Sequence, residues 1–377
     1  MKRVLGINAH LAAWAAAAML FAVGSTRAAS FAPGEVAEWV ESVGGAVARD
    51  AEGRITAVDL TSTPIGDADL SRLAAIPTLE RINLSHTLIS DAGLERLKPL
   101  ENVTVLNLYY AEYITDSGIA HLKEWPRLEE LNVCGSKVTS ALFEHIAEMK
   151  SLRSLDVGFS RVTDDGFENL AGLENLETFA FAGNKMSGVA LPLLKLLPAL
   201  KNLDVSGWQR TDSGLWGLAL SDFNLDSIAQ LSQLESLDIG GSKVTDRGAA
   251  DLAALTNLHT LGLSETVISA RGIAPLAKLP HLARLNLWKS ERVDDKAAAH
   301  FAAMPAIETL ELTETGITDK TLDALEQVKT LKDVYVGGTA VSEARVEAFR
   351  AARPDCRITW WEKPTYPEKA AEEEEPE

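Results

Sequence analysis

Apolar residues recur along the chain in a fixed two-part pattern. In residues 79–97, LERINLSHTLISDAGLERL, an apolar–polar–apolar step at Ile82–Leu84 precedes leucines at helical spacing. Alternation with a period of two predicts a half-buried strand, and apolar residues three or four apart predict a helix with one buried face. A Ser/Thr–Asp pair between the two parts is typical of a helix N-cap. Each unit is therefore expected to fold as strand, turn, helix and loop.

The pattern occurs twelve times. The copies begin at Ile55, Leu79, Val103, Leu128, Leu152, Leu176, Leu200, Leu234, Leu258, Leu282, Ile307 and Leu331, at spacings of 24 or 25 residues except for 34 between Leu200 and Leu234. A single unit buries about seven apolar side chains, and each of them stabilises the fold by ~1.5–3 kcal/mol. This does not offset the loss of backbone conformational entropy, which costs roughly 1–2 kcal/mol for each ordered residue. Units must therefore stack, which predicts one right-handed α/β solenoid with parallel strands on its concave side and helices on its convex side.

The unit L-x-x-L-x-L-x-x-T-x-[IV]-[ST]-D-x-G-[LI]-x-x-L resembles the leucine-rich repeat. It is closest in form to the bacterial helix-bearing type, which is similar to F-box-associated and ribonuclease-inhibitor-like repeats. The resemblance covers about residues 55–350. It implies a horseshoe of about 12 units that acts as a protein-binding scaffold, and it does not name the target, because such scaffolds serve unrelated partners.

The regions outside the repeats suggest a division of the chain. We expect a signal peptide at 1–28, an N-terminal cap at 29–54 with a helix at Glu35–Val43 and a hairpin, leucine-rich repeats at 55–345, a C-terminal cap at 346–362 and an acidic disordered tail at 363–377. The alternative for the first segment is an uncleaved anchor, because the uncharged run from Val4 to Thr26 is long enough to span a bilayer. Cleavage would make this a periplasmic or secreted protein.

Acidic residues outnumber basic ones by 54 to 36, which gives a formal net charge of −18. Loss of residues 1–28 removes three basic residues and no acidic one, so the charge becomes −21. This excess argues against binding to nucleic acid or to an anionic membrane surface. It favours a basic or neutral protein partner.

The unit that begins at Leu200 is ten residues longer than its neighbours. We place its extra stretch within Leu215–Ile228, which contains Trp216, Phe223 and Asn224. An insertion in a regular array is often a loop on the binding face. A longer helix or a local bulge explains the extra residues equally well.

Acidic and amide residues line the predicted concave face. The residue between the last two strand anchors is Asp, Asn or Glu in nine of twelve units, and the acidic candidates for partner contact are Asp156, Asp204, Asp238 and Glu311. They form either a solvated ladder that bonds nearby backbone or an acidic stripe for a basic segment. A ladder of bound cations is not favoured, because no D-x-D-x-D-G loop occurs.

Aromatic residues follow several of the strands, where most units have Gly, Ser or Thr. Those proposed to contact a partner are Tyr109, Tyr110, Phe159, Trp208 and Trp288. Large exposed rings are frequent among binding hot spots. The alternative is that some of them fold over a neighbouring glycine and cover the edge of the core.

Reactive motifs are absent from the sequence. It has no H-E-x-x-H, G-x-S-x-G, P-loop or G-x-G-x-x-G, and the pairs Asp164–Asp165 and Asp294–Asp295 fall at helix caps. Cys134 and Cys356 are about nine strand steps apart, roughly 43 Å at ~4.8 Å per step, too far for a disulfide. The sequence therefore predicts a non-enzymatic protein-binding scaffold without catalytic residues, metal or cofactor. The alternative is a structural or glycan-binding cell-envelope protein.

Overall fold

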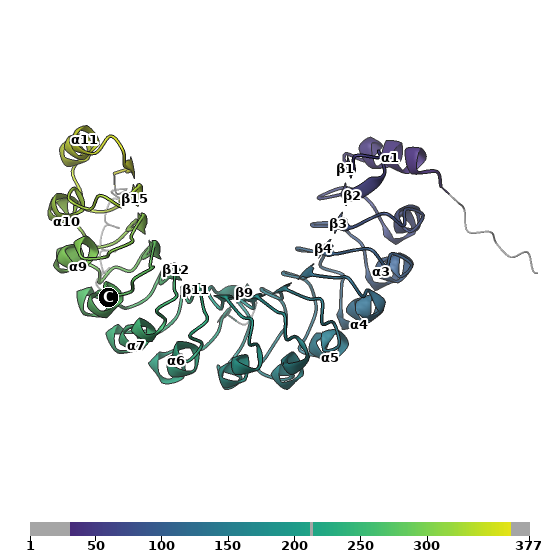
Figure 1. Cartoon of the computed structure of the whole chain (residues 1–377), viewed down its shortest axis with the longest axis horizontal. Coiled ribbons are helices and arrows are strands. Elements are labelled where there is room, and N and C mark those ends of the chain that lie inside the picture. Colours follow the sequence, from purple (N-terminus) through teal and green to yellow (C-terminus); the bar gives the residue numbers. More distant parts are fainter. Residues whose placement is uncertain (1–30, 212–213, 363–377) are drawn as a thin grey trace, which may run out of the picture.

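The computed structural model describes residues 31–211 and 214–362. Its strands line the inner side of an open arc, and its helices line the outer side (Figure 1). Strand order in the main sheet follows the sequence, and all neighbours pair in parallel except β1 and β2. Helices are wider than the ~4.8 Å between strands, so stacking the units bends the array toward the strands. The predicted α/β solenoid is confirmed.

The main sheet consists of short strands, one for each of the twelve units (β2 to β8 and β11 to β15) and one from each cap (β1 and β16). They are β1 (Ala46–Arg49), β2 (Ile55–Asp59), β3 (Arg81–Asn83), β4 (Val105–Asn107), β5 (Glu130–Asn132), β6 (Ser154–Asp156), β7 (Thr178–Ala180), β8 (Asn202–Asp204), β11 (Ser236–Asp238), β12 (Thr260–Gly262), β13 (Arg284–Asn286), β14 (Thr309–Glu311), β15 (Asp333–Tyr335) and β16 (Arg357–Thr359). In each strand between β3 and β16 the central residue is buried and the two flanking side chains lie on the concave face.

The outer layer consists of short α-helices and 3₁₀-helices, the latter labelled η. They are α1 (Pro33–Ser42), η1 (Asp67–Asp69), α2 (Leu70–Leu73), α3 (Asp91–Leu97), α4 (Asp116–Ala120), η2 (His121–Glu124), α5 (Leu142–Ile146), η3 (Phe167–Gly172), η4 (Leu191–Leu196), α6 (Asp222–Ala229), α7 (Asp246–Asp251), η5 (Leu252–Ala254), α8 (Ala270–Leu276), η6 (Asp295–Ala297), α9 (Ala298–Ala302), α10 (Asp319–Leu325) and α11 (Glu343–Ala352). Their apolar faces complete one continuous core that runs from Val36 to Ile358.

An aspartate at the start of most helices ties its unit to the next one. Asp91 accepts hydrogen bonds from the backbone N (2.8 Å) and the Oγ1 (2.6 Å) of Thr115, which begins the following helix. The same two bonds are accepted by Asp67, Asp116, Asp222, Asp246, Asp295 and Asp319. The Ser/Thr–Asp pair predicted as a cap therefore has two roles. Thr115 caps its own helix, and the aspartate clamps neighbouring units together.

Both ends of the array are covered. At the N-terminal end α1 packs its buried residues Val36 and Val40 on the first unit, and β1 pairs with β2 as a hairpin. At the C-terminal end Arg353, the residue that follows α11, is only 2% exposed. Its guanidinium donates to the carbonyl oxygens of Val328 (2.6 Å) and Leu331 (2.9 Å) and pairs with Asp355.

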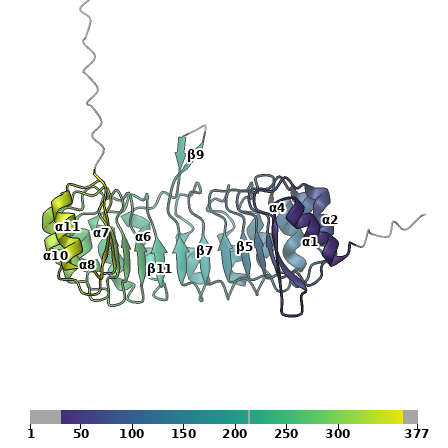
Figure 2. The same ribbon diagram turned by 90° about the horizontal axis from the view of Figure 1, so that it is seen from above.

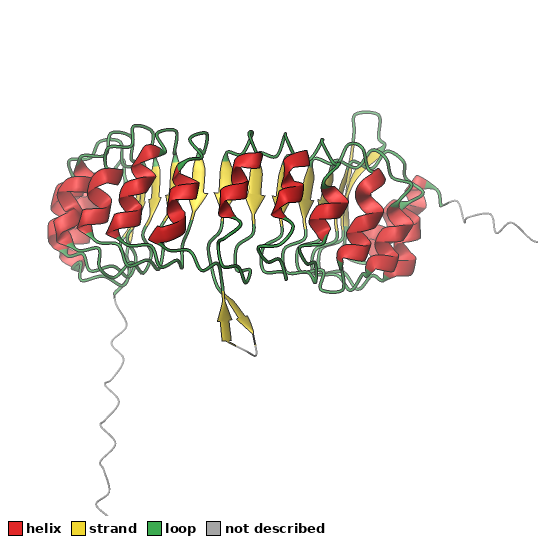
Figure 3. Cartoon of the chain, turned by 90° about the horizontal axis from the view of Figure 1, so that it is seen from below, coloured by secondary structure: helices red, strands yellow, loops and turns green. Residues whose placement is uncertain are grey.

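The insertion lies earlier in the sequence than predicted. Two additional strands, β9 (Gln209–Thr211) and β10 (Gly214–Trp216), form an antiparallel hairpin that projects from one edge of the array (Figures 2 and 3). The predicted range was Leu215–Ile228. Its later part instead belongs to the regular helix α6, in which Leu225 and Ile228 are buried. Phe223 is 91% exposed on that helix, and Asn224 accepts a hydrogen bond from the backbone N of Ser221. A longer helix does not explain the extra residues.

The remaining sequence-based predictions concern the two cysteines and the two ends of the chain. Cys134 and Cys356 are both free and buried, as expected from their separation. The predicted signal peptide, residues 1–28, and the predicted acidic tail, residues 363–377, lie outside the described residues.

Candidate functional site

The polar ladder on the concave face is built by local turns. Each ladder side chain accepts a hydrogen bond from the backbone N two residues later, for example Asn107 from Tyr109 (3.0 Å) and Asp204 from Ser206 (2.9 Å). Asp59, Asn83, Asn132, Asp156, Asp238, Asn286 and Glu311 do the same. Asn and Asp suit this position because their short polar side chains close a turn on their own backbone. An acidic ladder residue can therefore bond its own backbone and still present a carboxylate to a partner, so the two interpretations of the ladder do not exclude each other.

Three of the predicted acidic residues lie close together at the centre of the arc. Asp156, Asp204 and Asp238, which we call the acidic row, end strands β6, β8 and β11, and Asp204 is in register with Asp238. Burial raises the pKa of Asp156 and of Asp238, and the nearby charge of Asp204 raises both further. No ion pair with a Lys or Arg of the described residues neutralises this row. Glu311 lies three strands beyond Asp238 and is not part of the row.

Small residues surround the acidic row. Strand ends between Asp156 and Asn286 include Ala180 and Gly262, and the carboxylate of Asp238 lies where a Cβ on Gly262 would be. Cys134, Gly158, Ala182, Ser206, Gly240 and Ser264 follow these strands. Burial, together with Asp156 and Asp204, raises the pKa of the Cys134 thiol to about 12, so it is not a reactive thiolate. The centre of the concave face, which we call the concave trough because the sheet curves around it (Figure 1), thus carries small residues and carboxylates without an ion-pair partner among the described residues.

A left-handed backbone position follows each strand of the array. It is three residues after the ladder residue, and φ there lies between 49° and 78°. The residues are Ser62, His86, Tyr110, Gly135, Phe159, Gly183, Gly207, Gly241, Glu265, Lys289, Glu314 and Gly338. Glycine adopts this conformation without strain, whereas a large side chain there is rare. Tyr110 and Phe159 therefore occupy a position that favours glycine.

The rings of Tyr110, Phe159 and Trp208 each lie over a glycine in a following unit. A Cβ on Gly135 would be 2.7 Å from the Tyr110 ring, one on Gly183 would be 2.7 Å from the Phe159 ring, and one on Gly241 would be 2.5 Å from Nε1 of Trp208. We call these three residues the aromatic strip. They come from β4, β6 and β8, every second strand. The alternative that rings fold over glycines is therefore correct for these three, yet Tyr110 and Phe159 stay partly exposed and Trp208 is 38% exposed.

The remaining aromatic candidates belong to a different row. Tyr109 and Trp288 come two residues after the ladder, behind β4 and β13, toward opposite ends of the concave face. Tyr109 packs against Tyr110 and His86, with ring centroids 4.7 and 5.2 Å away. Trp288 is half-buried, with Nζ of Lys289 4.1 Å from its ring centroid. The structure therefore does not place Trp288 on the aromatic strip.

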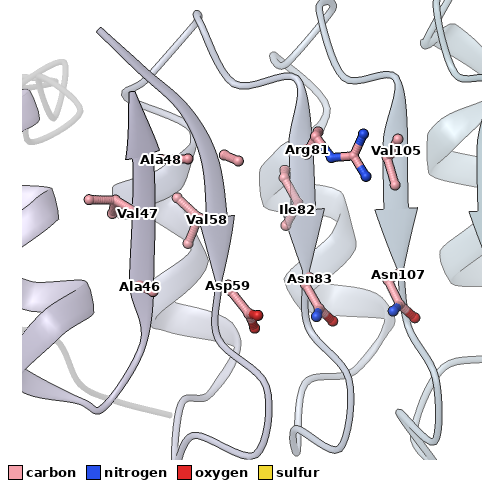
Figure 4. Close-up of a pocket in the computed structure, with 11 residues that line it drawn as sticks. Ala46, Val47, Ala48, Val58, Asp59, Arg81, Ile82, Asn83, Val105 and Asn107 are labelled. Carbon is pink, nitrogen blue, oxygen red and sulfur yellow. The ribbon is translucent and has the colours of Figure 1, made fainter. Parts of the chain in front are cut away.

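Three hollows accompany these rows. One of about 480 Å³ is lined by Tyr110, Phe159 and Trp208 together with Lys137 and Arg161. A second, of about 630 Å³, lies on the other side of Trp208. A third, of about 360 Å³, is at the N-terminal end of the concave face, where Arg81 lies beside Val105 at the start of the strands and the ladder residues Asp59, Asn83 and Asn107 lie at their ends (Figure 4). Its floor contains Ala46, Ala48 and Ala57. The strip thus separates two hollows at the centre of the arc.

Comparisons with known proteins support the assignment of the repeat. A family model described as a leucine-rich repeat matches residues 75–98, 148–171 and 231–253. The fold is similar to that of an internalin from Listeria monocytogenes, with a TM-score of 0.56 and 16% identity over 85% of this chain and 87% of the internalin. The chain contains leucine-rich repeats.

A second solved structure has the same fold. A leucine-rich repeat protein from Leptospira interrogans gives a TM-score of 0.50 and 18% identity over 77% of this chain and 74% of its own. No curated protein matches the chain. At these identities the two structures show the fold alone. Leucine-rich repeat arrays commonly mediate protein–protein interaction through their extended concave surfaces.

A row of cations on one edge of the leucine-rich repeat array was not predicted. Lys137, Arg161, Lys185, Lys243 and Arg292, which we call the basic row, occupy one register of the edge loop between strand and helix. The register is fixed by bridges such as Thr139 to Arg161 and Ser221 to Lys243. All five side chains are exposed. The spacing of 24 residues between Lys137, Arg161 and Lys185 was a readable signal, which the overall negative charge concealed.

Other kinds of site were sought in the described residues. Within 31–211 and 214–362 no three His, Cys, Asp or Glu side chains are arranged to hold a metal ion. No helix in the same ranges is long and apolar enough to cross a membrane. Asp294 caps its own helix through the backbone N of Lys296, as predicted, and Asp295 accepts from the backbone N of Thr318 in the next unit. Asp164 likewise accepts from the backbone N of Ser187 and Gly188 in the next unit, whereas Asp165 accepts, among the described residues, only from the Thr163 hydroxyl, so this pair does not cap η3, whose N-cap is Gly166.

Proposed function

We propose that this leucine-rich repeat protein is an exported, non-enzymatic scaffold that binds a protein or peptide through its concave face and aromatic strip. One observation carries the proposal. Tyr110 and Phe159 hold a left-handed backbone that costs about 1–3 kcal/mol for a residue other than glycine, although four of their neighbours use glycine there. Their rings do not complete the main core, so this cost is consistent with a role at the surface.

The concave trough supports the same proposal. The acidic row is partly buried and forms no ion pair with a Lys or Arg of residues 31–211 and 214–362, so a basic or neutral partner segment fits it better than an acidic one. The floor of small residues leaves room for the partner's side chains. Export is proposed from residues 1–28, which have the charge and hydrophobicity pattern of a signal peptide.

The experiment begins with the full chain and a partner identified by cross-linking in an exported fraction. Affinity is then measured by titration calorimetry for wild type, for Tyr110→Gly plus Phe159→Gly, and for Trp208→Ala. The glycine variants remove rings while restoring the residue preferred at that backbone position, so the fold is retained. We expect at least a tenfold loss of affinity, because exposed aromatic anchors dominate interfaces.

Phe223→Ala, at the exposed ring of α6, is the matched control and should change affinity less than twofold. Unchanged affinity in the strip variants would reject the strip as a contact surface.

A glycan-binding role is the second candidate. The partly exposed rings lie flat over glycines next to carboxylate and amide acceptors, an arrangement that also suits sugar rings. Affinity electrophoresis of the full chain in gels that contain purified cell-wall polysaccharides tests this role. Retardation that is lost in Trp208→Ala would support it, and equal mobility in all gels would reject it.

A further inference from the structure

Two charged side chains of opposite sign line the hollow at the N-terminal end of the concave face. Arg81 begins β3 and Asp59 ends β2, and both side chains are exposed. Thirteen ion pairs occur among residues 31–211 and 214–362, and none includes Arg81 or Asp59. Oδ1 of Asp59 accepts from the N (2.9 Å) and Oγ1 (2.6 Å) of Thr61, and no described residue donates to Oδ2. The hollow therefore offers a cation and an anion to the same occupant.

Two side-chain amides lie beside the carboxylate. Asn83 and Asn107 end β3 and β4 in register with Asp59, and Figure 4 shows these three side chains at one end of the strands and Arg81 at the other. Each amide accepts at Oδ1 from the backbone N two residues later, at 3.1 Å for Asn83 and 3.0 Å for Asn107. Neither Nδ2 donates to another residue in the part of the chain that the structure describes. Both amides can therefore donate to an occupant of the hollow.

Short side chains line the floor of the hollow. Ala57 and Val105 flank Arg81 in register on the neighbouring strands, and Ala46 and Ala48 belong to β1. Such side chains let the backbone of a ligand approach the sheet closely. With a volume of about 360 Å³, the hollow is at the lower end of the range for small-ligand sites. It therefore fits a short stretch of an extended segment rather than the surface of a folded domain.

We infer that this hollow binds an extended segment of the protein partner that carries an acidic and a basic residue two positions apart. The inference rests on the proposed function, because it assigns part of the concave face to that partner. The acidic side chain pairs with Arg81 and the basic one with Asp59, while the amides of Asn83 and Asn107 donate to carbonyl oxygens of the segment. A segment with charges of one sign alone would meet a like charge at one end of the hollow.

The separation of the two charges sets the spacing in the segment. Arg81 lies two residues before Asn83, about 6.6 Å at ~3.3 Å per residue, and Asp59 lies one strand to the side of Asn83, about 4.8 Å away. The backbones of Arg81 and Asp59 are therefore about 8 Å apart. In an extended segment, residues two positions apart lie on one face about 6.6 Å from each other, whereas adjacent residues point to opposite faces. The long side chains of the charged residues cover the remaining difference, so a spacing of two satisfies both charges and a spacing of one does not.

Saturation-transfer difference NMR of the full chain with two probe peptides tests the inference. Both peptides are acetylated and amidated, so their ends are uncharged. The peptide SESKS has its acidic and basic residues two positions apart, and SEKSS has the same composition with these residues adjacent. We expect SESKS to bind with a Kd about fivefold lower, since each exposed charge pair contributes only a small factor. Arg81→Gln and Asp59→Asn should each abolish this preference, and Asn at the second position retains the acceptor for the backbone N of Thr61.

A charge reversal separates recognition from folding. In Arg81→Glu both ends of the hollow are acidic, so the peptide SKSKS should bind more tightly than SESKS, a gain that a misfolded hollow cannot produce. Arg284→Gln is the matched control. Arg284 begins β13 in the same register as Arg81, but Gly262 and Glu311 lie on either side of Asn286 there, so the pair of amides is not repeated. This variant should leave the Kd of both probes unchanged.

Three outcomes would overturn the inference. They are no binding of SESKS, equal affinities of SESKS and SEKSS for wild type, and a loss of affinity in Arg284→Gln as large as that in Arg81→Gln. The probes need no identified partner, whereas the proposed function is decided by partner affinity in the variants of the aromatic strip. Loss of partner affinity in the strip variants without a preference between the probes would therefore overturn this inference alone. A clear preference between the probes with unchanged partner affinity in the strip variants would support the hollow and reject the strip.

Discussion

At the scale of single residues, the left-handed turn position controls what the edge of the array displays. Glycine is free to adopt φ near +65°, and seven described units nevertheless place another residue there. Where that residue is Tyr110 or Phe159, the glycine of a following unit makes room for its ring. Ring and glycine are therefore a coupled pair. Sequence inspection identified both residue types but could not pair them, because the contact depends on which way the ring leans.

The first prediction tests this coupling at Gly183. Its φ is +66°, and a Cβ would lie 2.7 Å from the Phe159 ring. We expect Gly183→Ala to lower the local free energy of unfolding by about 2–3 kcal/mol, about 1 of it from the left-handed backbone and the rest from the clash. Hydrogen exchange of the β7 and β8 amides measures the change.

Two variants separate these contributions. Gly44 has φ +90° and no atom within 4 Å of an added Cβ, so Gly44→Ala should cost only the backbone part. In a Phe159→Gly background the cost of Gly183→Ala should fall to that same value. An unchanged cost in that background would mean that the ring does not fill the space over Gly183.

The second prediction concerns Asp238 in the acidic row. Burial and the charge of Asp204 raise its pKa in the folded protein above its ordinary value of 3.8. The charged form is therefore disfavoured by folding, and Asp238→Asn should stabilise the protein at pH 7 by up to about 1 kcal/mol. Asn retains the acceptor for the backbone N of Gly240, as Asn286 does for that of Trp288. Urea denaturation at a series of pH values measures the effect.

The pH dependence of this effect has a definite sign. The advantage of Asp238→Asn should be complete above the raised folded pKa and should shrink as the pH falls toward 3.8, where wild type is also protonated. Asp59→Asn is the control, because Asp59 neighbours Asn83 rather than a second carboxylate. An advantage that grows on acidification would contradict the proposed repulsion in the acidic row.

At the scale of elements, the sequence predicted strands and helices well because each unit repeats the same burial pattern. Ile82, Leu84, Leu94 and Leu97 were assigned inward positions, and all are buried. The insertion was misplaced because Leu218, Leu220, Leu225 and Ile228 resume the apolar pattern and conceal where the regular unit restarts. The basic row was missed because its residues occupy the variable position of the T-x-[IV] part of the motif, where other units have Ala219, Val267 or Gly316.

The third prediction compares two adjacent carboxylates at one helix start. Asp295 accepts hydrogen bonds from the N and Oγ1 of Thr318 and from Oγ1 of Thr321, whereas Asp294 caps its own helix through the N of Lys296. We expect Asp295→Ala to cost about 2–4 kcal/mol and Asp294→Ala about 1 kcal/mol at pH 7. Thermal or urea unfolding distinguishes the two. Equal costs would contradict a special role for the bonds between units.

Acid should abolish the difference between wild type and Asp295→Ala. Burial raises the pKa of Asp295, but hydrogen bonds from Thr318 and Thr321 outweigh it, so the net pKa lies below 3.8. A lowered folded pKa stabilises the protein above the unfolded value, and this contribution is lost as the pH falls below about 3.8. Acidification should therefore weaken the hydrogen bonds between units. At the acidic row it should have the opposite effect, because protonation there removes repulsion.

At the scale of the whole molecule, charge is arranged in rows rather than spread evenly. The acidic row lies on the concave face, the aromatic strip lies next to it, and the basic row follows the edge beyond. Net charge alone suggested a uniformly acidic surface that favours basic partners. The array instead presents two surfaces of opposite sign, one on each side of the strip. A partner that reaches across the strip would therefore need both basic and acidic groups.

The fourth prediction concerns how far a local change spreads through the array. Each unit contacts only its neighbours, so stability is nearly a sum of local terms. Arg353→Met would leave the carbonyl oxygens of Val328 and Leu331 without their donors at about 1–3 kcal/mol each. Hydrogen exchange should quicken in α11, β15 and β16 and stay unchanged in β2, β3 and β4.

Arg353→Lys should not restore protection, because one ammonium cannot reproduce the planar fork that reaches both carbonyls and Asp355. Arg350→Met, on the exposed face of α11, loses a 3.5 Å hydrogen bond to the carbonyl oxygen of Ile358 and should have a much smaller effect on the strands. Faster exchange at both ends of the array in Arg353→Met would show instead that the arc unfolds as one cooperative unit, and the C-terminal cap would then stabilise the whole molecule rather than its last units.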